Sequence, residues 1–103
     1  MNMINDTRKT ALKDLRRIPG VGPSIADDLY ELGYRAVSDL RGADPERMYG
    51  ELCRDGHVDR CVLYVFRCAV YFAERREHDP ALLKWWNWTD DRSVVRRGKR
   101  EIG

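Results

Sequence analysis

The amino-acid sequence predicts an all-α fold, a compact domain of about five helices with a long central core helix. Apolar residues recur at helical spacing in several segments. Prolines and glycines separate these segments where helices begin and end. The longest apolar segment carries a polar stripe with a seven-residue period. A length of 103 residues suggests one domain. We expect this domain over residues 1–90, followed by a flexible, mildly basic tail over residues 91–103.

The composition is that of a folded protein with nearly balanced charge. Hydrophobic residues make up 43% and charged residues 35% of the chain, which excludes a disordered protein. The net charge of +2, from 19 basic and 17 acidic residues, is not that of a polycation that coats nucleic acid, so nucleic-acid binding requires a local patch. We predict no membrane span and no signal segment and, from three cysteines, a reducing, cytoplasmic location.

Two threonines offer a start for the first predicted helix. Thr7 or Thr10 can cap it, and it runs through about Arg17. Leu12 and Leu15 are three residues apart and share one face of this helix, so we expect that face to pack on the core.

The stretch IPGVGPSIADDLYELG, residues Ile18–Gly33, contains a tight turn followed by a second helix. Two prolines and two glycines within Pro19–Pro23 end the first helix, because proline lacks an amide donor and glycine tolerates positive φ. Ser24 then serves as the N-cap of the second helix, and Asp27 three residues later completes a weakened capping box. Gly33 is a natural residue to end this helix.

Shorter helical elements follow. Residues 36–40 predict a short helical turn, and residues 54–57 predict a non-helical one. An Asp-Pro pair predicts the start of a helix over Asp44–Leu52, because aspartate caps well and proline suits the first helical position. A second Asp-Pro pair predicts a short final helix over Asp79–Trp88.

The segment Asp59–Glu77 predicts a helix of about five turns, although its β-branched and aromatic residues suit strands. Its polar residues fall on one stripe, and the remaining surface is apolar. We interpret this segment as the central core helix, or alternatively as a helix that meets a partner subunit. The stripe consists of Arg60, Tyr64, Arg67, Tyr71 and Glu74.

The turn after the first helix has a known counterpart. The apolar residue, the Pro-Gly-Val-Gly turn and the small residues that start the next helix resemble the helix-hairpin-helix motif of DNA-binding and repair proteins. Glycines let a backbone approach a phosphate, and a helix start offers unpaired amides and the positive end of its dipole. Such a site contacts DNA without reading its sequence, and Val21 would point inward to join the helices. The matching residues are Leu15, Ile18, Gly20, Val21, Gly22, Ala26, Leu29 and Gly33. The predicted phosphate-binding residues are Gly20, Val21, Gly22, Ser24, Arg16 and Arg17.

Two features of this chain depart from members of that motif that grip DNA. Ser24 stands where they often carry a basic residue, and Asp27 and Asp28 fall in the predicted first turn of the second helix. Carboxylates there suit the helix dipole but repel phosphate. The alternative is therefore a hairpin that serves only as a rigid connector or a protein-docking surface.

A longer pattern extends this resemblance over about Leu12 to Asp90. The hairpin, the residues from Gly56 to Ala73, and the final Lys-Trp-Trp-Asn-Trp segment are together similar to the small bacterial "pathogenicity locus" family of helix-hairpin-helix proteins. The resemblance implies an all-helical fold with an inferred link to nucleic acid. It supplies no established catalytic residues.

The cysteines, a histidine and the tryptophans give further candidates. Cys53, His57 and Cys61 are spaced by four residues and are the candidates for a metal site, whereas the alternative is that the thiols are core residues. We predict no metal and no cofactor. Trp86 points away from the face of its tryptophan neighbours, so we expect it to stack on an unpaired base or to contact a protein.

These observations lead to one function and two alternatives. We expect a non-enzymatic accessory module that binds DNA weakly and without sequence preference through the amides of the hairpin. The first alternative is a protein-interaction module with a purely structural hairpin. The second is a small metal or thiol protein.

Overall fold

The computed structural model describes residues 3–90 and confirms the all-α prediction within that range. The tail predicted over residues 91–103 lies outside the described residues. The described part contains four α-helices joined by 3-10 turns, rather than five helices. The α-helices are α1 (Met3–Leu15), α2 (Pro23–Glu31), α3 (Pro45–Leu52) and α4 (Arg60–Glu74). The 3-10 turns are η1 (Val37–Leu40), η2 (Cys53–Asp55), η3 (Pro80–Leu83) and η4 (Trp85–Trp88).

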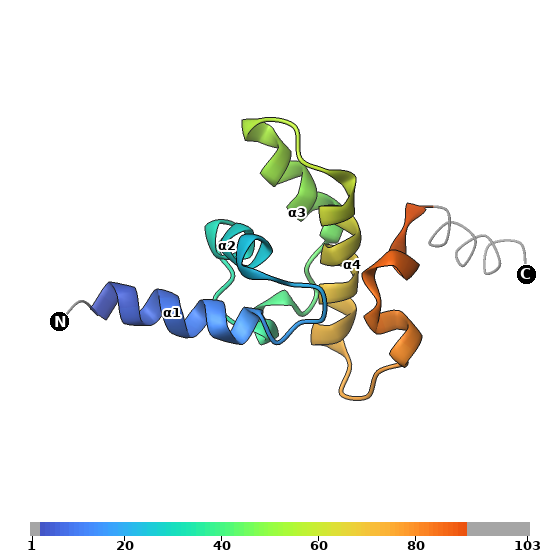
Figure 1. Ribbon diagram of the computed structural model, residues 1–103, viewed down its shortest axis with the longest axis horizontal. Helices are drawn as coiled ribbons and strands as arrows, with labels where there is room; N and C mark the ends of the chain where they lie inside the picture. Colours follow the sequence, from blue (N-terminus) through green and yellow to red (C-terminus); the bar gives the residue numbers. More distant parts are fainter. Residues whose placement is uncertain (1–2, 91–103) are drawn as a thin grey trace, which may run out of the picture.

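Helix α4 is the centre of the fold, as predicted. It contacts α3, η1, η3 and η4. Figure 1 shows the α1–α2 pair on one side of α4 and residues 79–90, which we call the C-terminal segment, on the other. The apolar face of α4 supplies Leu63, Phe66 and Cys68 to the fully buried core, and Phe66 is the largest of the fully buried side chains in the described residues. We therefore assign α4 to the core of this domain. None of the helices in residues 3–90 is both long enough and apolar enough to cross a membrane.

Helix α4 is shorter than the predicted segment Asp59–Glu77. Asp59 caps its start by accepting a hydrogen bond from the Cys61 amide at 3.0 Å. Its end comes at Glu74, because the next residue is extended and the chain turns back. His78 then lies 2.9 Å from the Phe72 carbonyl oxygen and stacks on the Phe72 ring, with the ring centroids 4.7 Å apart. The turn thus provides a partner for one of the carbonyls at the end of the helix.

The start of α2 corrects the sequence prediction. Gly22, not Ser24, is the N-cap, and Pro23 occupies the first helical position. Proline suits that position because its φ is already helical and its missing amide would have no partner there. Consequently no acidic residue lies in the first turn, and Asp27 forms no capping box. At the other end Gly33 has φ of +106°, which confirms its predicted role in ending the helix.

Helix α1 and the final segment also differ from expectation. Helix α1 contains both predicted caps, Thr7 and Thr10, because it starts at Met3. It ends at Leu15 rather than near Arg17, in a tightened turn with hydrogen bonds to carbonyls three residues back. The predicted final helix is instead the two turns η3 and η4, which are separated by the extended Lys84.

Side-chain hydrogen bonds explain why the final segment is not one α-helix. The Trp88 indole N–H donates to the Leu82 carbonyl at 2.8 Å, and the Asn87 amide donates to the Ala81 carbonyl at 2.7 Å. These bonds occupy carbonyls that an α-helix would pair with backbone amides. The segment is therefore held folded back on itself.

Candidate functional site

The turn between α1 and α2, residues 16–22, is anchored to the core at two points. Ile18 and Val21 are both buried, and the Val21 amide donates to the Ile18 carbonyl at 3.1 Å. Gly20, between them, has φ of +86°, a conformation that glycine adopts without strain. Ala26 in α2 is fully buried as well, so the two helices cross closely. The prediction that Val21 points inward is confirmed.

The start of α2 presents donors without partners. Among the described residues, no hydrogen bond is made by the amides of Gly22, Ser24 and Ile25. A Cβ on Gly22 would meet no atom within 4 Å, so this side of the turn is open. Unpaired amides and the positive end of the helix dipole together favour an anion at this position.

Basic side chains from the second half of α1 and from the first two residues of the turn lie on one side of the molecule. A depression of about 780 Å³ is lined by four basic residues, Lys9, Lys13, Arg16 and Arg17, together with Thr10 and Leu12. Successive basic residues are four, three and one positions apart, so they fall close together on one side of a helix and its end. We call these four basic residues the α1 basic row. All four are exposed. Arg16 and Arg17 were predicted site residues, whereas the helical spacing that adds the two lysines was overlooked.

The members of the α1 basic row differ in whether they form an ion pair within the protein. Arg17 pairs with Asp14 at 2.8 Å, which reduces the charge that it can offer to a ligand. Asp14 also accepts a hydrogen bond from the Val37 amide at 2.8 Å, and this bond together with Arg17 lowers the pKa of its carboxyl. Within the described residues, neither Arg16 nor the two lysines form an ion pair.

The two aspartates of α2 oppose an anion less than the sequence suggested. Both lie beyond the first turn of the helix. Asp27 pairs with Arg8 of α1 at 2.9 Å. Burial raises the pKa of Asp28, as do the negative charges of Asp27 and Glu31. The negative charge near the turn is therefore partly compensated.

Trp85 contacts the turn from the opposite end of the chain. A Cβ on Gly20 would lie only 3.1 Å from Cδ1 of Trp85, so the indole covers the glycine directly. The ring of Trp86 meets the ring of Trp85 edge-on, with centroids 5.7 Å apart. Trp86 is 52% exposed and is the one exposed large hydrophobic side chain in the described part of the chain. The structure thus connects Trp86, through Trp85, to Gly20, which is one of the predicted phosphate-binding residues.

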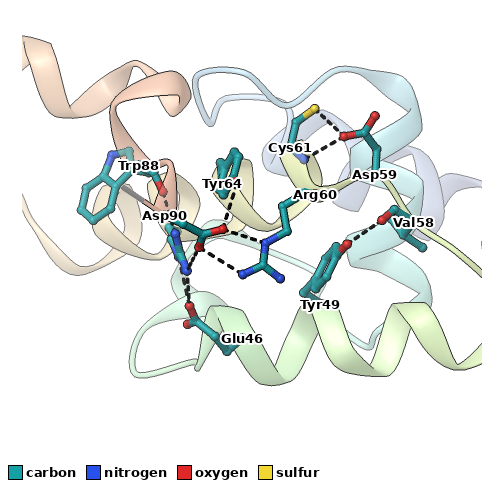
Figure 2. Close-up of polar contacts among 10 residues, drawn as sticks. Glu46, Tyr49, Val58, Asp59, Arg60, Cys61, Tyr64, Trp88 and Asp90 are labelled. Atoms are coloured by element: carbon teal, nitrogen blue, oxygen red, sulfur yellow. Dashed lines mark hydrogen bonds and ion pairs between the residues drawn. The ribbon is translucent and has the colours of Figure 1, made fainter. Parts of the chain in front are cut away.

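Hydrogen bonds hold the C-terminal segment on the polar stripe of α4 (Figure 2). Asp90 accepts hydrogen bonds from Arg60 at 2.9 and 3.0 Å, from the Tyr64 hydroxyl at 3.0 Å and from Arg67 at 3.0 Å. These bonds, chiefly those from Arg60, hold the pKa of Asp90 well below its usual range. We call Asp90 and these three partners the Asp90 cluster.

Arg67 is the buried member of the Asp90 cluster, with only 8% of its side chain exposed. It also donates to Glu46 of α3 at 2.6 Å and to the Trp88 carbonyl at 2.8 Å. The guanidinium group therefore joins α3, α4 and η4. The spacing of the polar residues predicted the stripe on α4 but not the residues that it binds.

The structure does not gather the proposed metal ligands. Cys53, His57 and Cys61 take part in no group of three potential ligands that could hold a metal ion, in a search of the described residues. The Cys61 thiol donates to Asp59 at 2.8 Å, and this contact raises the pKa of the thiol. Burial raises the pKa of Cys68 to about 11. A raised pKa lowers the fraction of thiolate, so burial and the contact with Asp59 make these two thiols poorer nucleophiles.

Comparison with known protein families places this chain. A family model described as "Cdd1: Pathogenicity locus" matches residues 8–94. The chain belongs to the Cdd1 family. No match was found among curated proteins or among solved structures. The Cdd1 match includes the α1 basic row, the α1–α2 turn and the tryptophan segment, so every part of the candidate site lies within the family region.

Proposed function

We propose that this Cdd1 protein is a non-enzymatic accessory module that binds DNA through its phosphates, without sequence preference. The observation that carries the proposal is the open start of α2, where three amides lack partners, directly after the α1 basic row. Amides and basic side chains both recognise phosphate and carry no information about bases.

The α1–α2 turn has the features expected of a helix-hairpin-helix. Its two helices are in contact, Val21 is buried between them, and Gly22 leaves the amides accessible. A phosphate bound there would sit on the axis of α2, where the helix dipole favours negative charge. The sequence resemblance to this motif supports the same interpretation.

The charges near the turn favour this function more than the sequence alone did. Arg8 compensates Asp27, and the first turn of α2 holds no carboxylate. The overall charge of +2 remains small, so we propose weak binding that depends strongly on salt. DNA binding of this type supports a partner enzyme or a larger assembly rather than acting alone.

Fluorescence anisotropy with a labelled DNA duplex of arbitrary sequence, measured over a salt series, tests the proposal. The logarithm of the affinity should fall with the logarithm of the salt concentration, with a slope of about −0.9 for each phosphate contacted. Lys13→Glu and Arg16→Glu should each weaken binding and make this slope shallower. Arg54→Glu in η2 makes the same charge change away from the α1 basic row and should change affinity much less.

Two outcomes would contradict the proposal. The first is no binding to any DNA at low salt by folded protein. The second is equal loss of affinity in all three charge-reversal variants, which would indicate attraction by net charge alone.

The alternative, a protein-interaction module, rests on one observation. Trp86 remains exposed although both of its tryptophan neighbours are partly buried. The apolar face of α4, which offered a second docking surface in the sequence, is occupied by the core of this domain.

A further inference from the structure

Trp86 occupies an unusual position because an indole this exposed directly follows Trp85, the residue that covers Gly20 in the α1–α2 turn. Large aromatic side chains are normally buried, because the apolar area that they leave exposed adds no stability. Its neighbours explain how it is held there. Trp85 packs on the core and on Gly20, while Asn87 and Trp88 bond to the carbonyls of η3. The Trp86 side chain is therefore presented from an anchored segment.

The surroundings of Trp86 distinguish between two kinds of ligand. A protein-docking surface usually combines several exposed apolar side chains into one patch. In the described part of the chain, Trp86 is the one large apolar side chain in the exposed class. A single exposed aromatic ring, joined through Trp85 to a turn proposed to bind phosphate, instead suits single-stranded nucleic acid, whose bases stack on aromatic rings while its phosphates bind elsewhere on the same surface.

We propose that Trp86 is a stacking platform for an unpaired base, so that the preferred ligand of this protein is single-stranded DNA. This inference rests on the proposed phosphate contact at the α1–α2 turn. The turn and the platform are linked by direct contacts, from Gly20 to Trp85 and from Trp85 to Trp86. In this proposal one strand places a phosphate at the start of α2 and a base of the same strand on the Trp86 ring. In a duplex the bases are paired and stacked on one another, and this second contact is not made.

The test compares Trp86→Ala and Trp86→Phe with the unchanged protein. Affinities for labelled oligothymidine and for a duplex of the same length are measured by anisotropy at one low salt concentration. Stacking on one base predicts that Trp86→Ala weakens oligothymidine binding by roughly 5- to 100-fold. Duplex binding should change less than twofold. Trp86→Phe should recover a large part of the oligothymidine affinity, because its ring still stacks.

Each outcome of this test has a separate meaning. If both DNA forms lose affinity equally on Trp86→Ala, or if neither does, Trp86 is not a base platform and the inference is overturned. An unchanged affinity would assign the exposed indole to another contact, such as a protein.

If the unchanged protein binds neither form of DNA, the proposed function itself fails. If it binds duplex with the predicted salt dependence but Trp86→Ala has no effect, only the further inference fails. Thermal unfolding of each variant confirms that the protein is folded, which the exposure of Trp86 leads us to expect.

Discussion

Gly20 lies directly against the indole of Trp85, so that a Cβ on the glycine would come within 3.1 Å of Cδ1 of the tryptophan. The two residues are far apart in the sequence. Their contact joins the α1–α2 turn to the C-terminal segment, in which the ring of Trp86 meets the ring of Trp85. The arrangement of the candidate site therefore depends on how the C-terminal segment is held.

We expect Gly20→Ala to destabilise the protein by about 2–3 kcal/mol, because alanine is strained at a φ of +86° and its methyl group displaces Trp85. Gly42→Ala is the matched control. Gly42 also has positive φ, at +76°, but a Cβ there meets no atom within 4 Å. We expect a loss of about 1 kcal/mol for Gly42→Ala, from backbone strain alone. Urea unfolding gives both values, and equal losses would show that the contact with Trp85 is unimportant.

Asp90→Asn should loosen the C-terminal segment by weakening its bonds to Arg60 and Arg67. We expect a loss of about 1 kcal/mol, a modest value because the Asp90 side chain is 41% exposed. Glu77→Gln, which removes a charge from an exposed position, is the control. The loss should appear as lower urea stability at neutral pH, together with faster proteolysis of the C-terminal segment.

The effect of Asp90→Asn should depend on pH in a defined direction. The pKa of Asp90 is lower in the folded protein than in the unfolded chain. Its stabilising effect is therefore fully present above the unfolded value of about 4 and is lost as the pH falls toward the folded value. The difference in stability between the unchanged protein and Asp90→Asn should shrink as the solution is acidified below about pH 4. A difference that does not change with pH would contradict the assignment of Asp90 as a paired carboxylate.

Asp28→Asn should raise the stability of the protein near neutral pH, whereas Asp90→Asn should lower it. Burial, together with the charges of Asp27 and Glu31, raises the pKa of Asp28 in the folded protein. Its ionisation therefore opposes folding above the raised pKa and has no effect at pH values well below the unfolded one. We expect Asp28→Asn to be more stable than the unchanged protein near neutral pH and equally stable near pH 2. Urea unfolding at the two pH values checks this, and a loss of stability at neutral pH would contradict it.

Local signals in the sequence predicted most of the helices. Asp44, Asp59 and Asp79 each cap the element that they were expected to start, because an N-cap needs only a side chain and the amides that follow it. Gly33 ends α2 for a similarly local reason. The start of α2 was placed two residues late at Ser24, because two local signals competed and the proline determined the start.

The rest of the site depends on contacts between distant parts of the chain. The sequence gives no signal that Trp85 covers Gly20 or that Asp90 binds Arg60 and Arg67, since both contacts follow from how the C-terminal segment folds over α4. Arg8 was overlooked for the same reason, because its pairing with Asp27 needs α1 and α2 to be in contact. The pairing of Arg8 with Asp27 changes the charge near the turn. The two aspartates of α2, taken from the sequence alone, had suggested that the turn would repel phosphate.

The central claim, that phosphate binds at the open start of α2, is tested most directly by comparing Gly22→Asp with Gly22→Asn. The backbone at Gly22 is extended and its surroundings are open, so both side chains fit and both can cap the helix. The two variants have nearly the same shape and differ in one negative charge. We predict that both variants fold, that Gly22→Asn binds DNA within a few-fold of the unchanged protein, and that Gly22→Asp loses measurable binding at low salt. Equal DNA affinity of the two variants, measured by anisotropy under the same conditions, would contradict it.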